Sequence, residues 1–124
     1  MKRLIALLFL GAVPFLYGCD SGDTIGCSTE ARAGVEVSIF DADTGKPIIS
    51  AEVTGLVQEG IYLERLFHLE STNTLSGAYE RPGTYTISIS LPGYVEWKVS
   101  DVNVTRDECH VLTVRMDAFL TKTL

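Results

Sequence analysis

The sequence has 124 residues, 46% of them hydrophobic, which is enough for one domain with its own core and too little for two. Its 16 Asp and Glu residues outnumber its 10 Lys and Arg residues, so the formal net charge is −6. Because the neutralisation of phosphates needs clustered cations, this balance argues against nucleic-acid binding.

The chain begins with the three parts of a secretory signal. Lys2 and Arg3 are followed by a mostly apolar run over residues 4–16, and a small residue, Gly18, comes shortly after that run. A glycine and a proline interrupt the run, which is also shorter than the roughly 20 apolar residues of a membrane-spanning helix. We therefore interpret residues 1–18 as a signal peptide.

The stretch LYGC resembles the lipobox of bacterial lipoproteins. The match lies at Leu16, Gly18 and Cys19, whereas Tyr17 is larger than the residue usual at that position. The resemblance implies cleavage before Cys19, acylation of its thiol with palmitate-type chains, and anchorage to a membrane of the bacterial cell envelope, either inner or outer. The alternative is an ordinary signal peptide followed by an incidental cysteine. Cleavage would also remove two positive charges and lower the net charge from −6 to −8.

Three cysteines are an odd number for an exported protein, and the lipobox accounts for one of them. With Cys19 lipidated, Cys27 and Cys109 remain as a pair in an oxidising compartment, and we predict a disulfide between them. The alternative is two separate buried thiols. The cysteines lack the close spacing of a zinc site, and only His110 lies beside one of them, as an expected structural neighbour of the bridge.

Residues 19–32 are small and polar and are interpreted as the lipidated anchor and a short tether. From residue 33 the pattern alternates, and Val35, Val37 and Ile39 are predicted to share the buried face of a strand. The segment DADTGKP over residues 41–47 predicts a turn. The turn-forming residues expected there are Asp41, Asp43 and Gly45.

Two further strands are expected over residues 48–58 and 61–71, although composition alone leaves a helix open for the second. In residues 61–71 the alternation separates two faces. One face carries Ile61, Leu63, Phe67 and Leu69, and the other carries Tyr62, Glu64, His68 and Glu70. We interpret the face with the charged residues as solvated and outward.

The remaining chain contains a short strand near residues 75–80 and the clearest alternation of the sequence in residues 83–91. Its predicted core residues are Tyr85, Ile87, Ile89 and Leu91. Pro92 and Gly93 fit the second and third positions of a type II turn. Strands over residues 94–104 and 110–119 complete about seven strands without a convincing helix, which predicts an all-β, two-sheet antiparallel sandwich.

The motifs VSIFDADTGKPI, AEV, GTYTISI and PGY, in this order, resemble the carboxypeptidase regulatory-like domain. The resemblance implies a transthyretin-like, prealbumin-type sandwich over residues 33–118, followed by a C-terminal tail over residues 119–124. Members of this fold mostly serve as accessory or interaction modules, so the resemblance implies no particular ligand.

We therefore expect a non-enzymatic, membrane-anchored envelope lipoprotein whose sandwich binds a protein, peptide or glycan, without a cofactor or metal. One alternative is a small hydrolase or metal-dependent enzyme that uses His68 with the carboxylates Glu64 and Glu70. Another is a structural spacer. Asp41 and Asp43 resemble the start of a calcium loop, but the later oxygen ligands are missing, so a turn is the interpretation.

Overall fold

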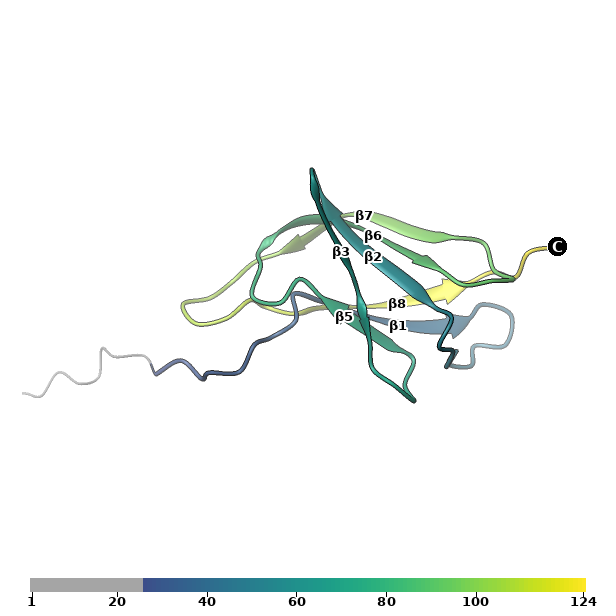
Figure 1. Cartoon of the computed structure of the whole chain (residues 1–124), viewed down its shortest axis with the longest axis horizontal. Coiled ribbons are helices and arrows are strands. Elements are labelled where there is room, and N and C mark those ends of the chain that lie inside the picture. Colours follow the sequence, from purple (N-terminus) through teal and green to yellow (C-terminus); the bar gives the residue numbers. More distant parts are fainter. Residues whose placement is uncertain (1–25) are drawn as a thin grey trace, which may run out of the picture.

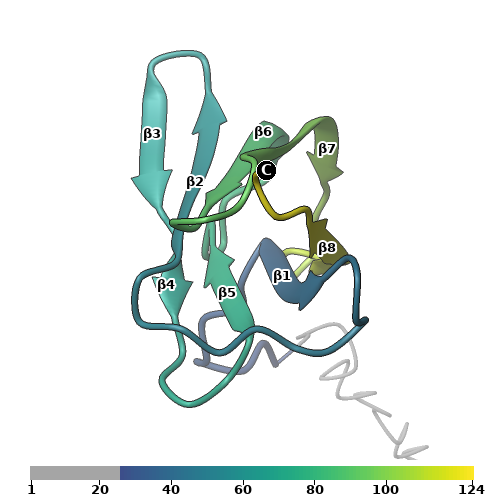
Figure 2. The same cartoon turned by 90° about the vertical axis from the view of Figure 1, so that its right-hand side faces the viewer.

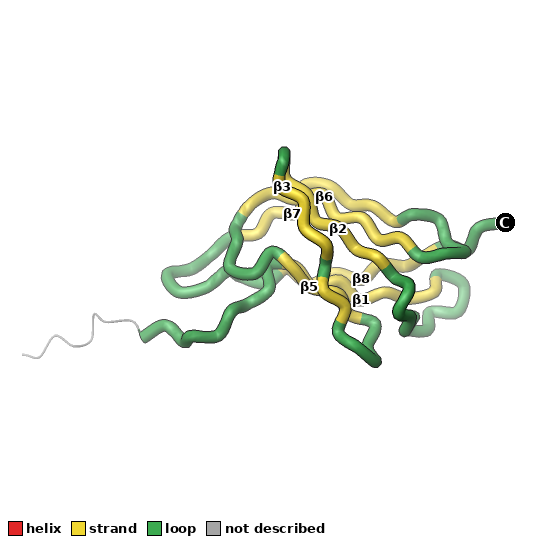
Figure 3. The backbone as a smooth tube through the Cα atoms, in the orientation of Figure 1, coloured by secondary structure: helices red, strands yellow, loops and turns green. Residues whose placement is uncertain are grey.

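In the computed structural model, which describes residues 26–124, two four-stranded β-sheets pack face to face (Figure 1). The strands are β1 (Val35–Asp41), β2 (Thr54–Glu59), β3 (Tyr62–Arg65), β4 (Phe67–His68), β5 (Thr74–Gly77), β6 (Gly83–Ser90), β7 (Trp97–Val104) and β8 (Val114–Leu120). The predicted all-β, two-sheet sandwich is confirmed. Residues 26–124 contain strands and loops but no helix (Figure 3), so this part of the chain has no helix that could cross a membrane.

The strand order is β4-β5-β1-β8 in the first sheet and β3-β2-β6-β7 in the second. All neighbours are antiparallel except β1 and β8, which run parallel from the pair Val35 and Val114 to the pair Asp41 and Leu120. The predicted antiparallel arrangement holds at every pair of neighbouring strands except this one. Parallel pairing is possible here because the chain passes through the whole second sheet between β1 and β8, which gives it room to return in the same direction.

The core forms where the predicted alternations meet between the sheets. Val35, Val37 and Ile39 of β1 are completely buried, as the period-two pattern predicted. The inward side chains of β6 and the residue after it oppose them from the second sheet: Tyr85, Ile87, Ile89 and Leu91.

Strand β7 contains an irregularity that the sequence pattern did not reveal. Its register against β6 shifts between the pairs Tyr85–Val102 and Ile87–Val99, and Asp101 has a positive φ of 59°. The extra residue is a β-bulge, which changes the phase of the alternation. Val99 and Val102 can therefore both pack against the core although an even alternation would place them on opposite faces.

The predicted strand over residues 61–71 is divided between the two sheets. Residues 62–65 pair with β2 and residues 67–68 pair with β5, so the two edge strands β3 and β4 lie on one side of the sandwich (Figure 2). Leu66 lies between them, with only 4% of its surface exposed. This division accounts for the eighth strand.

Other boundaries also differ from those expected. Strand β2 begins at Thr54, because the segment from Pro47 onward makes only a single bridge to Phe40 before it turns. Strand β8 runs to Leu120, past the boundary expected at residue 118, and the amide of Thr123 donates to the carbonyl of Gly93 over 2.9 Å. Residues 119–123 are therefore part of the folded domain and not a free tail.

Candidate functional site

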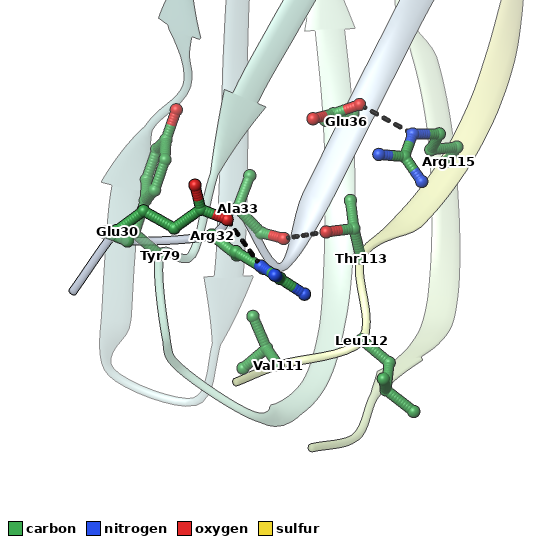
Figure 4. Close-up of a pocket in the computed structure, with 10 residues that line it drawn as sticks. Glu30, Arg32, Ala33, Glu36, Tyr79, Val111, Leu112, Thr113 and Arg115 are labelled. Carbon is green, nitrogen blue, oxygen red and sulfur yellow. Dashed lines mark hydrogen bonds and ion pairs between the residues drawn. The ribbon is translucent and has the colours of Figure 1, made fainter. Parts of the chain in front are cut away.

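An open pocket of about 510 Å³ lies where the segment before β1, the loop after β5 and the loop before β8 meet (Figure 4). Two ion pairs line it: Arg32 Nε lies 3.0 Å from Glu30, and Arg115 Nε lies 3.0 Å from Glu36. The hydroxyl of Thr113 donates to the carbonyl of Ala33 over 2.7 Å. The remaining lining residues are Ala31, Tyr79, Val111 and Leu112. The walls are largely polar, with both signs of charge.

Three side chains next to this pocket form a continuous hydrogen-bonded array. Ser28 Oγ lies 2.9 Å from His110 Nε2, and His110 Nδ1 lies 2.8 Å from Glu80 Oε1. His110 is only 6% exposed, whereas Ser28 is exposed. A carboxylate can only accept, so Nδ1 carries the proton and donates to Glu80. In the neutral ring, Nε2 then accepts from the Ser28 hydroxyl.

Backbone contacts fix the carboxylate and the imidazole in place. Glu80 Oε1 also accepts from the amide of Arg32 over 2.9 Å, and this bond, together with the one from His110, holds the pKa of Glu80 below its usual value. Asp107 Oδ1 accepts from the amides of Cys109 and His110, and these bonds lower the pKa of Asp107. Both carboxylates are therefore ionised at neutral pH.

The loop that carries Glu80 has an unusual backbone. Ala78 and Glu80 have positive φ angles of 52° and 51°, a region that residues other than glycine seldom occupy. The amide of Glu80 donates to the carbonyl of Arg32, and the amide of Arg81 donates to the carbonyl of Ala78. Neighbouring contacts thus maintain a conformation that costs free energy locally, a feature that clusters at functional sites.

The predicted disulfide between Cys27 and Cys109 is confirmed, with the two Cα atoms 5.2 Å apart. Ser28 and His110 are the residues that directly follow the two cysteines. The bridge therefore fixes the backbone on both sides of the Ser28–His110 contact. Cys19, the predicted lipidation site, lies outside the described residues.

The predicted turn at residues 41–47 is organised by Asp41, which is only 6% exposed. Its Oδ1 accepts from the amides of Asp43 and Thr44 over 2.8 and 3.0 Å. Its Oδ2 accepts from the Tyr94 hydroxyl over 2.8 Å. These bonds, led by the one from Tyr94, lower the pKa of Asp41 to about 2. Gly45 has a positive φ of 72°. Asp41 is thus a structural acceptor, and Asp43 contributes its amide.

Pro92 and Gly93 occupy the centre of a turn in which the amide of Tyr94 donates to the carbonyl of Leu91 over 3.0 Å. Gly93 has a φ of 87°, which a type II turn requires at its third position. The Tyr94 hydroxyl in turn reaches Asp41. The two turns whose motifs carry the family resemblance therefore contact each other at one end of the sandwich.

The candidate cluster of His68, Glu64 and Glu70 does not assemble. Nε2 of His68 hydrogen-bonds to the carbonyl of Thr72 over 2.7 Å, and Glu64 accepts from the Tyr62 hydroxyl. His68 and Glu70 line a separate, smaller pocket that Glu64 does not share. Among residues 26–124, no three His, Cys, Asp or Glu side chains are grouped closely enough to hold a metal ion. The structure offers no convergent geometry for the chemistry proposed for His68.

The orientation assigned to residues 61–71 is also wrong. The four apolar residues are the exposed ones, and we call them the apolar stripe: Ile61 (106% exposed), Leu63 (59%), Phe67 (61%) and Leu69 (54%). The alternate residues of this segment face inward instead: Leu66 belongs to the core, and Tyr62 packs against the edge of the core. Arg81 lies 3.7 Å above the Tyr62 ring, and burial raises the pKa of that tyrosine to about 12.

The array of Ser28, His110 and Glu80 was missed because its members are far apart in sequence. Ser28 falls in the presumed tether, and Glu80 falls in a loop. The only local signal was the position of His110 beside a cysteine that was expected to form a bridge.

Comparison with known proteins assigns no family to the chain. No protein-family model matches it, and a search of curated proteins finds no match. The fold and the geometry of these sites therefore carry the argument about function.

Proposed function

We propose that this chain is a lipid-anchored lipoprotein of the bacterial cell envelope whose β-sandwich binds an extended segment of another envelope protein. The observation that carries the binding role is the apolar stripe along residues 61–69, where four large apolar side chains in and beside β3 and β4 lie more than half exposed. Four large exposed apolar side chains along one short segment support this role, because exposed apolar patches mark interaction sites on protein surfaces.

The edge of β3 offers the second component of such a binding site. Glu59 and Tyr62 are the paired residues on either side of the two-residue turn between β2 and β3, and the pairing continues from them to Leu56 and Arg65. Since antiparallel pairing alternates, the peptide groups of Leu63 and Arg65 point away from β2. These groups can pair with an added strand while the apolar stripe contacts its side chains, which is the mode called β-augmentation.

The proposed anchor is compatible with this role. Cys19 and Cys27 are separated by eight peptide units, which span at most about 28 Å when extended. The disulfide fixes Cys27 to the loop before β8. The described N-terminal segment and the C-terminus lie at opposite ends of the sandwich (Figure 1). A short tether would thus hold the domain near the membrane, while its net negative charge would disfavour contact with anionic lipid.

Metabolic labelling with palmitate tests the anchor. The wild-type chain is expected to incorporate label and to sediment with membranes, and Cys19→Ser is expected to lose both properties. Cys27→Ser serves as the matched control, since it removes a cysteine without altering the lipobox. Equal labelling of the wild type and Cys19→Ser would contradict the proposal.

Site-specific photo-cross-linking in cells tests the binding face. A cross-linker in place of Leu63 or Phe67 is expected to trap one envelope protein, with the cross-links mapping to a single extended segment of it. A cross-linker in place of Asp117, which is exposed on β8, serves as the control. Cross-links only to lipid, only to a second copy of the chain, or absent altogether would overturn the proposal, and complete absence would favour the structural spacer.

A further inference from the structure

We propose that Ser28, His110 and Glu80 form a nucleophilic site that transfers or hydrolyses short acyl groups, with Ser28 as the nucleophile, His110 as the general base and Glu80 as the residue that orients the base. This site is separate from the apolar stripe, and the proposal does not depend on the binding function. It departs from the expectation, drawn from the sequence, that the chain has no enzymatic activity.

The distances support this assignment directly. A nucleophile, a base and an orienting acid require two successive hydrogen bonds of about 2.6–3.2 Å. The Ser28–His110 and His110–Glu80 contacts measure 2.9 and 2.8 Å. The order of atoms is also the required one, because Nε2 faces the hydroxyl and Nδ1 faces the carboxylate. His110 is therefore held in the tautomer that can accept the serine proton.

Burial and exposure are divided as the chemistry needs. His110 is 6% exposed, so its ring is held by surrounding atoms, while Ser28 is exposed and within reach of a ligand. The disulfide links the residues immediately before Ser28 and His110. Preorganised contacts of this kind reduce the entropic cost of bringing the reacting groups together.

The neighbouring pocket indicates the class of substrate. Its lining includes residues close in sequence to each member of the array: Glu30 near Ser28, Tyr79 beside Glu80, and Val111 beside His110. Ion pairs and an open mouth disfavour a long acyl chain, which needs an enclosed apolar tunnel. The pocket instead fits a short ester, such as an acetyl ester, on a polar molecule.

The reaction is balanced without a cofactor. The Ser28 oxygen attacks the ester carbonyl carbon, and its proton passes to Nε2 of His110. The bond from carbon to the leaving alcohol then breaks, and the alcohol leaves with that proton. Water, activated by the same nitrogen, hydrolyses the acyl-serine, releases the carboxylic acid and returns the hydroxyl to Ser28.

A fluorophosphonate probe tests the nucleophile on the intact, disulfide-bonded protein. The serine oxygen bonds to phosphorus and fluoride leaves, so one stable adduct per chain is expected on the peptide that contains Ser28. Ser28→Ala is expected to abolish the adduct. Ser100→Ala, which removes an exposed serine of β7, is expected to leave labelling unchanged. A wild-type protein that is not labelled, or is labelled elsewhere, would overturn the proposal.

Further variants test the base and the acid. His110→Gln should slow labelling by about 100-fold or more, which is the usual contribution of a general base, and Glu80→Gln should slow it by a smaller factor. Unchanged rates in both would overturn the assigned roles. Because His110→Gln could unfold the loop, the pH profile of the wild type provides an independent readout. The labelling rate is expected to depend on pH, because only the neutral imidazole of His110 can accept the serine proton. A flat profile would refute the role of His110.

The substrate class is tested with 4-nitrophenyl esters. Acetate is expected to be turned over faster than decanoate by the wild type, with Ser28→Ala reduced to the background rate. Faster turnover of decanoate would contradict the substrate class derived from the pocket. Turnover by Ser28→Ala equal to that of the wild type would contradict the site itself.

Discussion

Leu66 is held between two glycines, one in each sheet, and this arrangement permits a sharp test of the packing. A Cβ atom added at Gly55 of β2 would lie 2.8 Å from Cδ1 of Leu66, and one added at Gly77 of β5 would lie 2.5 Å from Cδ2. Neither glycine has a positive φ. Their absent side chains therefore make room for a leucine and do not serve an unusual backbone conformation.

Single substitutions at this contact should be destabilising for opposite reasons. Leu66→Ala leaves a cavity between the sheets and should lower the free energy of unfolding by about 2–5 kcal/mol. Gly77→Ala forces a methyl group against Leu66, and overpacking of this kind costs about 1–3 kcal/mol. The higher strand propensity of alanine should offset less than about 1 kcal/mol of that cost.

The double variant distinguishes packing from independent local effects. With Leu66 truncated, the methyl group at position 77 loses its closest contact, and only the flexible carboxylate of Glu64, 3.2 Å away, remains tight. The double variant should therefore be at least as stable as Leu66→Ala alone. The coupling energy should then be about 1 kcal/mol or more in the stabilising direction. Combining Leu66→Ala with Gly26→Ala is the control, because nothing lies within 4 Å of a Cβ at Gly26.

Urea unfolding, followed by the fluorescence of the single tryptophan, Trp97, measures all of these variants. Additivity of Leu66→Ala and Gly77→Ala within about 0.5 kcal/mol would refute the clamping of Leu66 between the sheets. Strong coupling between Leu66→Ala and Gly26→Ala would show instead that the cycle does not report local packing.

Three further predictions concern the bridge and the turns. Replacing Cys27 and Cys109 with serine should lower the free energy of unfolding by about 4.5 kcal/mol, since the bridge closes a separation of 82 residues; a loss below about 1 kcal/mol in urea unfolding would contradict this. Gly45→Val should lower the free energy of unfolding by about 1–3 kcal/mol, because valine is strained at the φ of 72° found there, whereas Gly26→Val should change it little. Equal urea midpoints for the two variants would count against the strained turn. Because the folded-state pKa of Asp41 is lowered to about 2, the ionised carboxylate stabilises the fold fully above about pH 4, and this stability is lost as the pH falls through about 2. Asp41→Asn should therefore weaken the pH dependence of the free energy of unfolding, measured in urea across that range. An unchanged pH dependence would show that Asp41 is not its source.

The sequence by itself determined the local features of this protein. Period-two patterns identified the buried faces of β1 and β6, because each alternation depends only on the pleat of its own strand. The cysteine count predicted the pairing of Cys27 with Cys109. Gly45 and Gly93 have the positive φ angles that their turns require, since that requirement arises within a few residues.

Only the tertiary structure decided how the segments combine. Residues 61–71 have two faces, and the sequence pattern did not show which of them packs against the core. The face with Leu66 does so, because its side chain fills a space left by glycines in both sheets. The bulge at Asp101 changed the phase of β7 through its pairing with β6. The array of Ser28, His110 and Glu80 exists because a disulfide and a strained loop bring three distant segments together, and no local pattern encodes such a contact.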